Sequence, residues 1–89
     1  MMPTAADQLA FVAANLAGSA AIARFASRLS ISGGDDEVVV NFAGRTLSIR
    51  AAGQGLVVGS DEIALGDDEQ ETLGRVASRL AQRLTQMDG

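Results

Sequence analysis

Five residue types are missing from this 89-residue chain: histidine, cysteine, tryptophan, tyrosine and lysine. Histidine is the usual acid–base residue near neutral pH, and cysteine and lysine supply most side-chain nucleophiles other than serine and threonine. Histidine and cysteine are also the commonest zinc ligands. Only carboxylates, hydroxyls and arginine remain for chemistry. We therefore predict a protein that is not an enzyme and that binds neither a metal nor a cofactor.

The lack of cysteine is typical of a cytoplasmic protein. The N-terminal segment is also acidic, through Asp7, where a secretory signal has basic residues. The uncharged stretch Gln8–Ala23 is shorter than the roughly 20 apolar residues that a membrane span needs. We interpret this stretch as a buried helix and expect a cytoplasmic protein without membrane contact.

Aromatic residues make up only 3% of the chain, although 47% of its residues are hydrophobic. The length predicts one domain, residues 1–89. A domain of this size buries only about 60–65% of the surface of its unfolded chain. Because small aliphatic side chains supply the apolar content, we expect part of it to lie at an interface with a partner or a second copy.

The first predicted element is a helix that begins after Thr4. The Thr4 hydroxyl can cap the helix, and Asp7 lies at the positive end of its dipole. Apolar residues then recur at the spacing of one helix face. These residues are Leu9, Val12, Ala13, Leu16, Ala20 and Ala23.

Gly18–Ser19 indicates a break in this helix, after which the serine can cap a second short helix. Leu29 and Ile31 alternate with serines, which indicates an extended chain near Arg28. The sequence leaves open whether residues 18–32 form one helix, two helices, or a helix followed by a strand.

Alternating apolar residues predict a β-hairpin followed by shorter strands. The tight connection Ala43–Gly44 separates the two strands of the hairpin. The glycine-rich segment Ala52–Gly55 is a second turn. The predicted strands are Glu37–Phe42, Arg45–Arg50, Leu56–Val58 and, as a weakly paired fourth, Glu62–Leu65.

The clearest predicted helix follows Asp67 or Asp68, either of which can cap it with Gln70 or Glu71 as the capping-box partner. The predicted order is α-β-β-β-(β)-α. It gives an α+β fold, in which a single antiparallel sheet of three or four strands has the N- and C-terminal helices on one face. Seven apolar residues form the inner stripe of the last helix: Leu73, Val76, Ala77, Leu80, Ala81, Leu84 and Met87.

Negative charge is concentrated in the middle of the chain, whose formal net charge is −4. Residues 35–71 contain nine of the eleven acidic residues and two of the seven arginines. Clustered carboxylates bind hard cations, but no segment has the spacing of a calcium loop. Acids at a helix start also stabilise the helix dipole. We therefore favour capping over metal binding for Asp67, Asp68, Glu69 and Glu71.

The same acids can imitate nucleic-acid phosphates and occupy a basic groove of a partner, because charge attraction steers such binding. The alternative is a solvated face that keeps the protein soluble. Eight residues are the candidates for partner binding: Asp35, Asp36, Glu37, Asp61, Glu62, Asp67, Asp68 and Glu69.

Arg75, Arg79 and Arg83 line one edge of the last predicted helix at intervals of four residues. Such a stripe can contact phosphates. The chain is acidic, however, and the stripe has no interleaved aromatic residues, so we expect no direct nucleic-acid binding. Glu71 can pair with Arg75 on the helix surface. We interpret the stripe as an exposed face or as a contact with the acids of a second copy.

The order helix, hairpin, strand, acidic turn and helix resembles two groups of proteins. In the short bacterial DUF2218 proteins of unknown function, a strand that ends in an aromatic residue and glycine, as in Val40–Gly44, precedes leucine-rich strands and a final amphipathic helix. This resemblance covers roughly residues 25–84. The size, the acidity and the segment Asp61–Glu71 resemble small acidic anti-CRISPR proteins of phages and mobile elements. That resemblance implies a protein that binds an effector complex and blocks its use of nucleic acid.

The leading prediction is a non-enzymatic protein–protein interaction domain. In its sharpest form it is an inhibitor that docks an acidic face on the nucleic-acid-binding surface of a larger complex. The competing prediction is a self-associating, homodimeric module without an external ligand. In this module the alanine-rich first helix and the last helix pack against a second copy, which hides surplus apolar surface.

Overall fold

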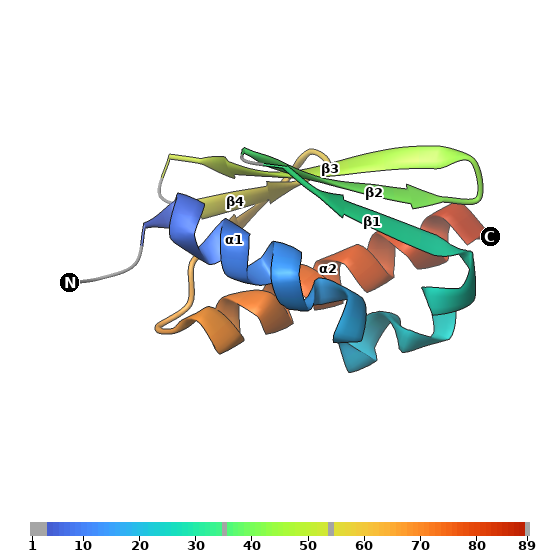
Figure 1. Ribbon diagram of the computed structural model, residues 1–89, viewed down its shortest axis with the longest axis horizontal. Coiled ribbons are helices and arrows are strands. Elements are labelled where there is room, and N and C mark those ends of the chain that lie inside the picture. The colour runs from blue at the N-terminus through green and yellow to red at the C-terminus, as the bar shows by residue number, and fades with distance from the viewer. Residues whose placement is uncertain (1–3, 35, 54, 89) are drawn as a thin grey trace.

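The computed structural model describes residues 4–34, 36–53 and 55–88. Helices cover one face of a five-stranded antiparallel sheet, and the other face is open (Figure 1). The predicted α+β fold is therefore confirmed, with five strands rather than three or four. In chain order the elements are α1 (Ala5–Asn15), the 3₁₀ helices η1 (Leu16–Gly18) and η2 (Ala20–Arg28), the strands β1 (Leu29–Gly33), β2 (Glu37–Phe42), β3 (Arg45–Ala52), β4 (Gly55–Val58) and β5 (Asp61–Ala64), and α2 (Glu69–Asp88).

Helix α1 begins, as predicted, at a capping box. The Asp7 amide donates a hydrogen bond to Oγ1 of Thr4 at 3.1 Å, and the Thr4 amide donates one to the Asp7 carboxylate at 3.2 Å. The box pairs backbone N–H groups that a helix start leaves without partners. The helix then buries Gln8, Leu9 and Val12.

The predicted break at Gly18–Ser19 bends the chain by 67° between α1–η1 and η2. The serine precedes η2, but its side chain does not make the predicted capping hydrogen bond. In a 3₁₀ helix, side chains three residues apart lie on one side, so Ile22 and Phe25 are the buried residues of η2. Ala20 and Ala23 are exposed. The prediction that they continue the buried stripe of α1 is therefore wrong.

The sheet is a meander in which each strand pairs with the next one along the chain, in the order β1-β2-β3-β4-β5. The strand not counted in the prediction is β1, where Ile31 lies opposite Val40 of β2. Inward-facing residues alternate along β2, where Val38, Val40 and Phe42 are buried. The core lies between this face of the sheet and the helices.

The connection between β2 and β3 is the predicted tight turn. Ala43 and Gly44 have positive φ angles of 53° and 79°, as in the two-residue type I′ turn, whose twist matches that of the flanking strands. The turn fixes a register in which Phe42 lies opposite Arg45.

Helix α2 closes the core. Asp68 is its cap, because Oδ1 of Asp68 accepts a hydrogen bond from the Glu71 amide at 2.8 Å. The predicted apolar stripe is confirmed, since four of its seven residues are buried and the other three are partly buried against the core. The buried four are Val76, Ala77, Leu80 and Leu84.

A buried polar pair joins α1 to α2 near the start of each helix. The Thr72 hydroxyl donates a hydrogen bond to Oε1 of Gln8 and accepts one from the Gly66 amide at 2.8 Å. Gln8 and Thr72 are only 3% and 0% exposed, so their polar atoms depend on these partners. The pair holds the two helix starts and the β5–α2 connection together.

Candidate partner-binding site at the acidic end

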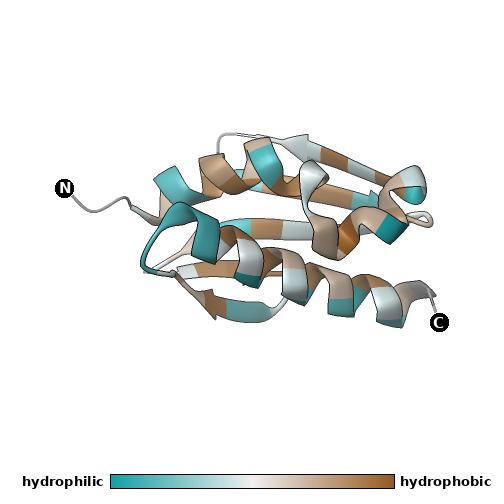
Figure 2. Cartoon of the chain, turned by 90° about the horizontal axis from the view of Figure 1, so that it is seen from below, coloured by the Kyte–Doolittle hydropathy of each residue, from teal (hydrophilic) through white to brown (hydrophobic). Residues whose placement is uncertain are grey.

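The starts of α1 and α2 lie at the same end of the molecule. In an antiparallel meander the β1–β2 turn, the β3–β4 turn and the end of β5 share one end of the sheet, and α2 follows directly after β5. Figure 1 shows both helices starting on the side of the N-terminus, and Figure 2 shows that the start of α2 is hydrophilic. We call this the acidic end because of the residues that it carries: Asp7, Asp36, Asp67, Asp68, Glu69 and Glu71.

Three predicted partner-binding residues lie together at the start of α2. Asp68 is engaged as the helix cap. The predicted surface pair of Glu71 and Arg75 is confirmed, with Oε1 and Nη2 at 2.6 Å. Asp67 is exposed and Glu69 is half-buried, and neither carboxylate has a hydrogen-bond or ion-pair partner among the described residues. These two carboxylates are therefore available to a partner.

A hollow beside these carboxylates contains an aromatic ring. Phe11 of α1 and the segment Asp67–Gln70 line a shallow hollow of about 360 Å³, and Phe11 is half-buried there. A cation above an aromatic ring is attracted by the ring's quadrupole, and carboxylates add charge-assisted hydrogen bonds. The hollow is therefore suited to an arginine or lysine side chain of a partner.

Sequence reasoning assigns Phe11 only to the apolar surface of the first helix and does not find this hollow. The signal is present but weak. Phe11 follows the buried Leu9 and precedes the buried Val12, at a helical position off the centre of the inner stripe. A large apolar side chain at such a flank marks a surface that is only partly covered.

The other predicted acids are distributed over the sheet. Asp36 is exposed in the β1–β2 turn at the acidic end, and Asp35 lies outside the described residues. Glu37 and Glu62 alternate with buried residues and therefore face the open side of the sheet. Glu37 lies opposite Arg50 in the register of β2 and β3.

Asp61 is placed differently from its neighbour in β5. Its Oδ2 lies 3.9 Å from Nη1 of Arg83 on α2, so it faces the helical side of the sheet. The eight predicted residues are therefore not one continuous face. The described ones are divided among the acidic end, the open side of the sheet and the Asp61–Arg83 contact.

The arginines of α2 contact groups of the same chain. Nη1 of Arg75 donates a hydrogen bond to the Ala64 carbonyl at 3.1 Å, and Nη1 of Arg79 donates one to Oε1 of Gln82 at 3.3 Å. Arg83 lies beside Asp61. The predicted arginine stripe is therefore engaged within the chain.

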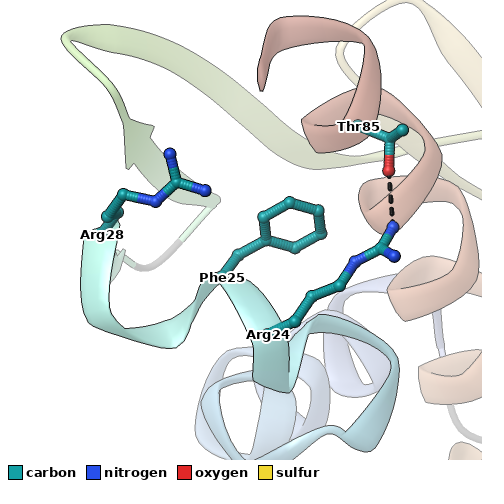
Figure 3. A pocket seen from close by; sticks show the side chains of 4 residues that line it. All are labelled: Arg24, Phe25, Arg28 and Thr85. Carbon is teal, nitrogen blue, oxygen red and sulfur yellow. Dashed lines mark hydrogen bonds between the residues drawn. The ribbon is translucent and has the colours of Figure 1, made fainter. Parts of the chain in front are cut away.

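A second hollow, away from the acidic end, is lined by arginines (Figure 3). Arg24, Phe25 and Arg28 of η2 and Thr85 of α2 surround about 220 Å³. Nη2 of Arg24 donates a hydrogen bond to Oγ1 of Thr85 at 2.7 Å. The same guanidinium lies 4.7 Å from the centre of the Phe25 ring. These contacts fasten η2 to α2.

The aromatic rings beneath this hollow fasten η2 to the sheet as well. Phe25 and Phe42 meet edge to face with their centres 5.4 Å apart, and the Arg28 guanidinium lies 5.0 Å from the Phe42 ring. Both geometries are attractive. Since Arg45 lies opposite Phe42, arginines gather here, and we call this the basic end (Arg24, Arg28 and Arg45).

Comparison of the chain with protein-family models, characterised proteins and solved structures finds no match. The resemblances to DUF2218 proteins and to anti-CRISPR proteins stay predictions.

Within residues 4–34, 36–53 and 55–88 no three carboxylates are grouped so that they could hold a metal ion. No single helix there is long and apolar enough to cross a membrane. Only the bent pair Ala5–Gly18 and Ala20–Arg28, taken together, reaches the necessary length and composition.

Proposed function

We propose that this chain is a non-enzymatic protein-binding module that docks its acidic end on a basic surface of a larger partner. One observation carries the proposal. The half-buried ring of Phe11 lies in one hollow with Asp67 and Glu69, whose carboxylates have no partner among the described residues. Aromatic anchors in small pockets with charged surroundings are typical of the residues that dominate binding energy at interfaces.

The partner group that fits this hollow is a guanidinium or an ammonium. A cation–π contact at an exposed site contributes about 0.5–1 kcal/mol, and more when water is excluded. A hydrogen bond between a charged donor and a carboxylate contributes about 1.5–3 kcal/mol. The hollow thus favours arginine, whose planar group can stack on a ring and bind a carboxylate at the same time.

More specifically, we propose that the basic surface of the partner otherwise binds nucleic acid. The module would then act as an inhibitor in the cytoplasm. The separation of charge along the molecule supports this form. An acidic end attracts a basic groove over a distance and orients the approach, while the basic end points the opposite way.

The experiment is a quantitative pull-down from bacterial lysate with three tagged proteins. They are the unmodified chain, the Asp67→Arg/Glu69→Arg variant and the Glu37→Arg/Glu62→Arg variant. None of the four acids is Asp68, the cap of α2. Both variants change the net charge by the same amount. We expect a nucleic-acid-binding complex that the unmodified chain and the sheet variant capture, that competitor DNA releases, and that the acidic-end variant binds about tenfold more weakly or worse.

Equal capture by the acidic-end variant would contradict docking at this end, and equal loss in both variants would indicate a net-charge effect only. The salt dependence gives a second readout. The affinity of the partner for the unmodified chain should fall with added salt. The decrease of affinity with salt concentration should be less steep for the Asp67→Arg/Glu69→Arg variant.

The exposed alanines of the helical layer favour a second candidate function, a self-associating module. Ala10, Ala14 and Ala17, together with Ala20 and Ala23, are all exposed. Surface of this kind is covered when two copies associate. The measurement is the mass in solution, which would be twice 9.1 kDa.

A further inference from the structure

The two edges of the sheet are protected to different degrees. The β5 edge has the acids Asp61 and Glu62, and Arg75 donates hydrogen bonds to the carbonyls of Ala64 and Leu65 at 3.1 and 3.4 Å. Short strands, charges and covered carbonyls are the usual means by which proteins block edge pairing. The β1 edge lacks such charges, because its sequence LSISG contains no charged residue and no proline.

The odd-numbered residues of β1 direct their backbone groups outward. The Gly34 amide donates a hydrogen bond to the Glu37 carbonyl at 2.7 Å, which makes these two the hydrogen-bonded pair that closes the β1–β2 hairpin. Residues alternate between hydrogen-bonded and non-bonded pairs along an antiparallel ladder. The N–H and C=O groups of Leu29, Ile31 and Gly33 therefore point away from β2. The Leu29 N–H donates a hydrogen bond to the Ala26 carbonyl of η2.

The flank of α1 beside β1 consists of alanines. A methyl group at Gly33 would lie 3.3 Å from Cβ of Ala13, so Ala13 faces β1. Ala6, Ala10 and Ala17 lie seven, three and four residues from Ala13, so they are on the same flank of the helix. All three are exposed. A row of small side chains is not a site by itself. Here the alanines continue the uncharged surface of the β1 edge onto the neighbouring helix α1.

We propose that β1 pairs antiparallel with β1 of a second copy of this chain, about a two-fold axis beside Ile31. The inference rests on the second candidate function, self-association, and is independent of docking at the acidic end. In this register Ile31 lies opposite the second copy's Ile31, and Leu29 lies opposite the second copy's Gly33. The N–H and C=O groups of Ile31 then pair with those of the second copy's Ile31, the Gly33 N–H meets the carbonyl of the second copy's Leu29, and the two sheets become one.

The symmetry of the edge favours a second copy over another protein. A two-fold rotation about Ile31 sets the outward N–H groups of Ile31 and Gly33 against the carbonyls of the second copy's Ile31 and Leu29, so these groups complement themselves. Each chain has a net charge of −4, yet this seam brings no charged side chains of β1 together. The rotation also places both alanine flanks on the same side of the joined sheet, one on each side of the axis, where small residues allow close approach. An extended peptide of another protein would pair with the strand but leave this flank uncovered.

The test uses charge at the seam without touching the core. Ser30 and Ser32 are exposed on the open side of the sheet, and in the proposed register Ser30 lies opposite the second copy's Ser32. The Ser30→Lys/Ser32→Lys variant therefore sets like charges against each other, which weakens cross-strand pairing. The matched control is Ala64→Lys, which places lysine at an exposed position of the β5 edge.

The readouts are the mass by sedimentation and the exchange rate of the Ile31 amide hydrogen. We expect the unmodified chain and the Ala64→Lys control to sediment at twice 9.1 kDa, with a protected Ile31 amide. The double-lysine variant should sediment as a monomer, with at least a tenfold faster exchange at Ile31 and an unchanged circular dichroism spectrum. A second variant, Ile31→Pro, removes an outward N–H group, which edge strands tolerate, together with a half-buried side chain at the margin of the core. It should also be monomeric, with a circular dichroism spectrum that shows the fold is kept.

Each contrary result has a distinct meaning. A monomeric unmodified chain at every concentration would overturn both the β1 pairing and self-association, and would leave the edge to a peptide of another protein. A dimer that persists in the double-lysine and Ile31→Pro variants would overturn the β1 register while self-association stands. Neither result changes the outcome of the Asp67→Arg/Glu69→Arg experiment, which measures capture of a different protein.

Discussion

At the scale of single residues, Thr72 supports the acidic end. Its hydroxyl donates to Oε1 of Gln8 and accepts from the Gly66 amide at 2.8 Å, and the side chain is fully buried. The hydroxyl also lies 3.3 Å from the carbonyl of Asp68, the cap of α2. One side chain thus fixes the first turn of α2, on which Asp67 and Glu69 depend.

Thr72→Val should lower the free energy of unfolding by about 1–3 kcal/mol. Valine keeps the shape of threonine but leaves the amide of Gly66 and the Gln8 oxygen without a partner, which costs the desolvation of buried polar groups. Urea denaturation monitored by circular dichroism measures the change. The control is Ser78→Ala, at an exposed serine of the same helix, which should change the free energy of unfolding by no more than about 0.5 kcal/mol. Equal losses in both variants would show that the buried hydroxyl has no special role.

The residue-level features that the sequence predicts are those formed by near neighbours. The Thr4 and Asp7 box and the Asp68 cap each connect residues three positions apart, and such motifs can be recognised in a string of letters. Thr72 and Gln8 are 64 positions apart. Nothing local indicates that a glutamine of one helix and a threonine of another share a hydrogen bond.

At the scale of elements, strands and helices with a clear period are predicted, and the ambiguous stretch 18–32 is not. The β2 and β3 strands alternate and α2 repeats at helical spacing, so their positions follow from pattern. Over the nine residues of η2, periods of 3.0 and 3.6 are too close to separate, so its buried residues, Ile22 and Phe25, are not assigned correctly. The β1 strand has only two large apolar residues, and its status depends on pairing with β2.

Gly74→Ala should stabilise α2. Gly74 is exposed within the helix, and a Cβ there would contact nothing within 4 Å. Alanine is favoured over glycine in a helix by about 0.5–1 kcal/mol. The melting temperature should therefore rise by about 2–8 °C.

A substitution of the opposite sign serves as the control for Gly74→Ala. At Gly55 a Cβ would lie 2.6 Å from the carbonyl oxygen of Ile63, so Gly55→Ala should lower the melting temperature by pushing β4 away from β5. A decrease for Gly74→Ala would mean that the outer face of α2 tolerates no added methyl group. That result would contradict the open surroundings of Gly74.

At the scale of the whole molecule, the acidic end and the basic end lie at opposite ends of a body of 40 × 21 × 19 Å. The sequence predicts the excess of acid in residues 35–71 but not its division among three places. That division follows from the register, which turns Glu62 to the open side and Asp61 towards Arg83. Side-chain direction along a strand alternates with every residue, so neighbours in sequence become members of different surfaces.

The melting temperature of the whole protein should depend on its concentration. If two copies share a sheet through β1, mass action stabilises the folded dimer as concentration rises. A tenfold increase should raise the melting temperature by about 3–5 °C, measured by calorimetry. The Ser30→Lys/Ser32→Lys variant should melt at one temperature throughout. A concentration-independent melting temperature for the unmodified chain would argue against the dimer.

The strictly sequential order of the strands has a consequence for synthesis of the protein. Each strand can pair with its predecessor as soon as it leaves the ribosome, and short-range pairing of this kind forms quickly. The inner face of the finished sheet is fully covered only when Val76, Leu80 and Leu84 of α2 pack against it, and these residues are synthesised afterwards. Until that helix arrives, the apolar surface of β4 and β5 that α2 covers is open to water. The nascent chain thus passes through a stage in which it is a natural client for chaperones.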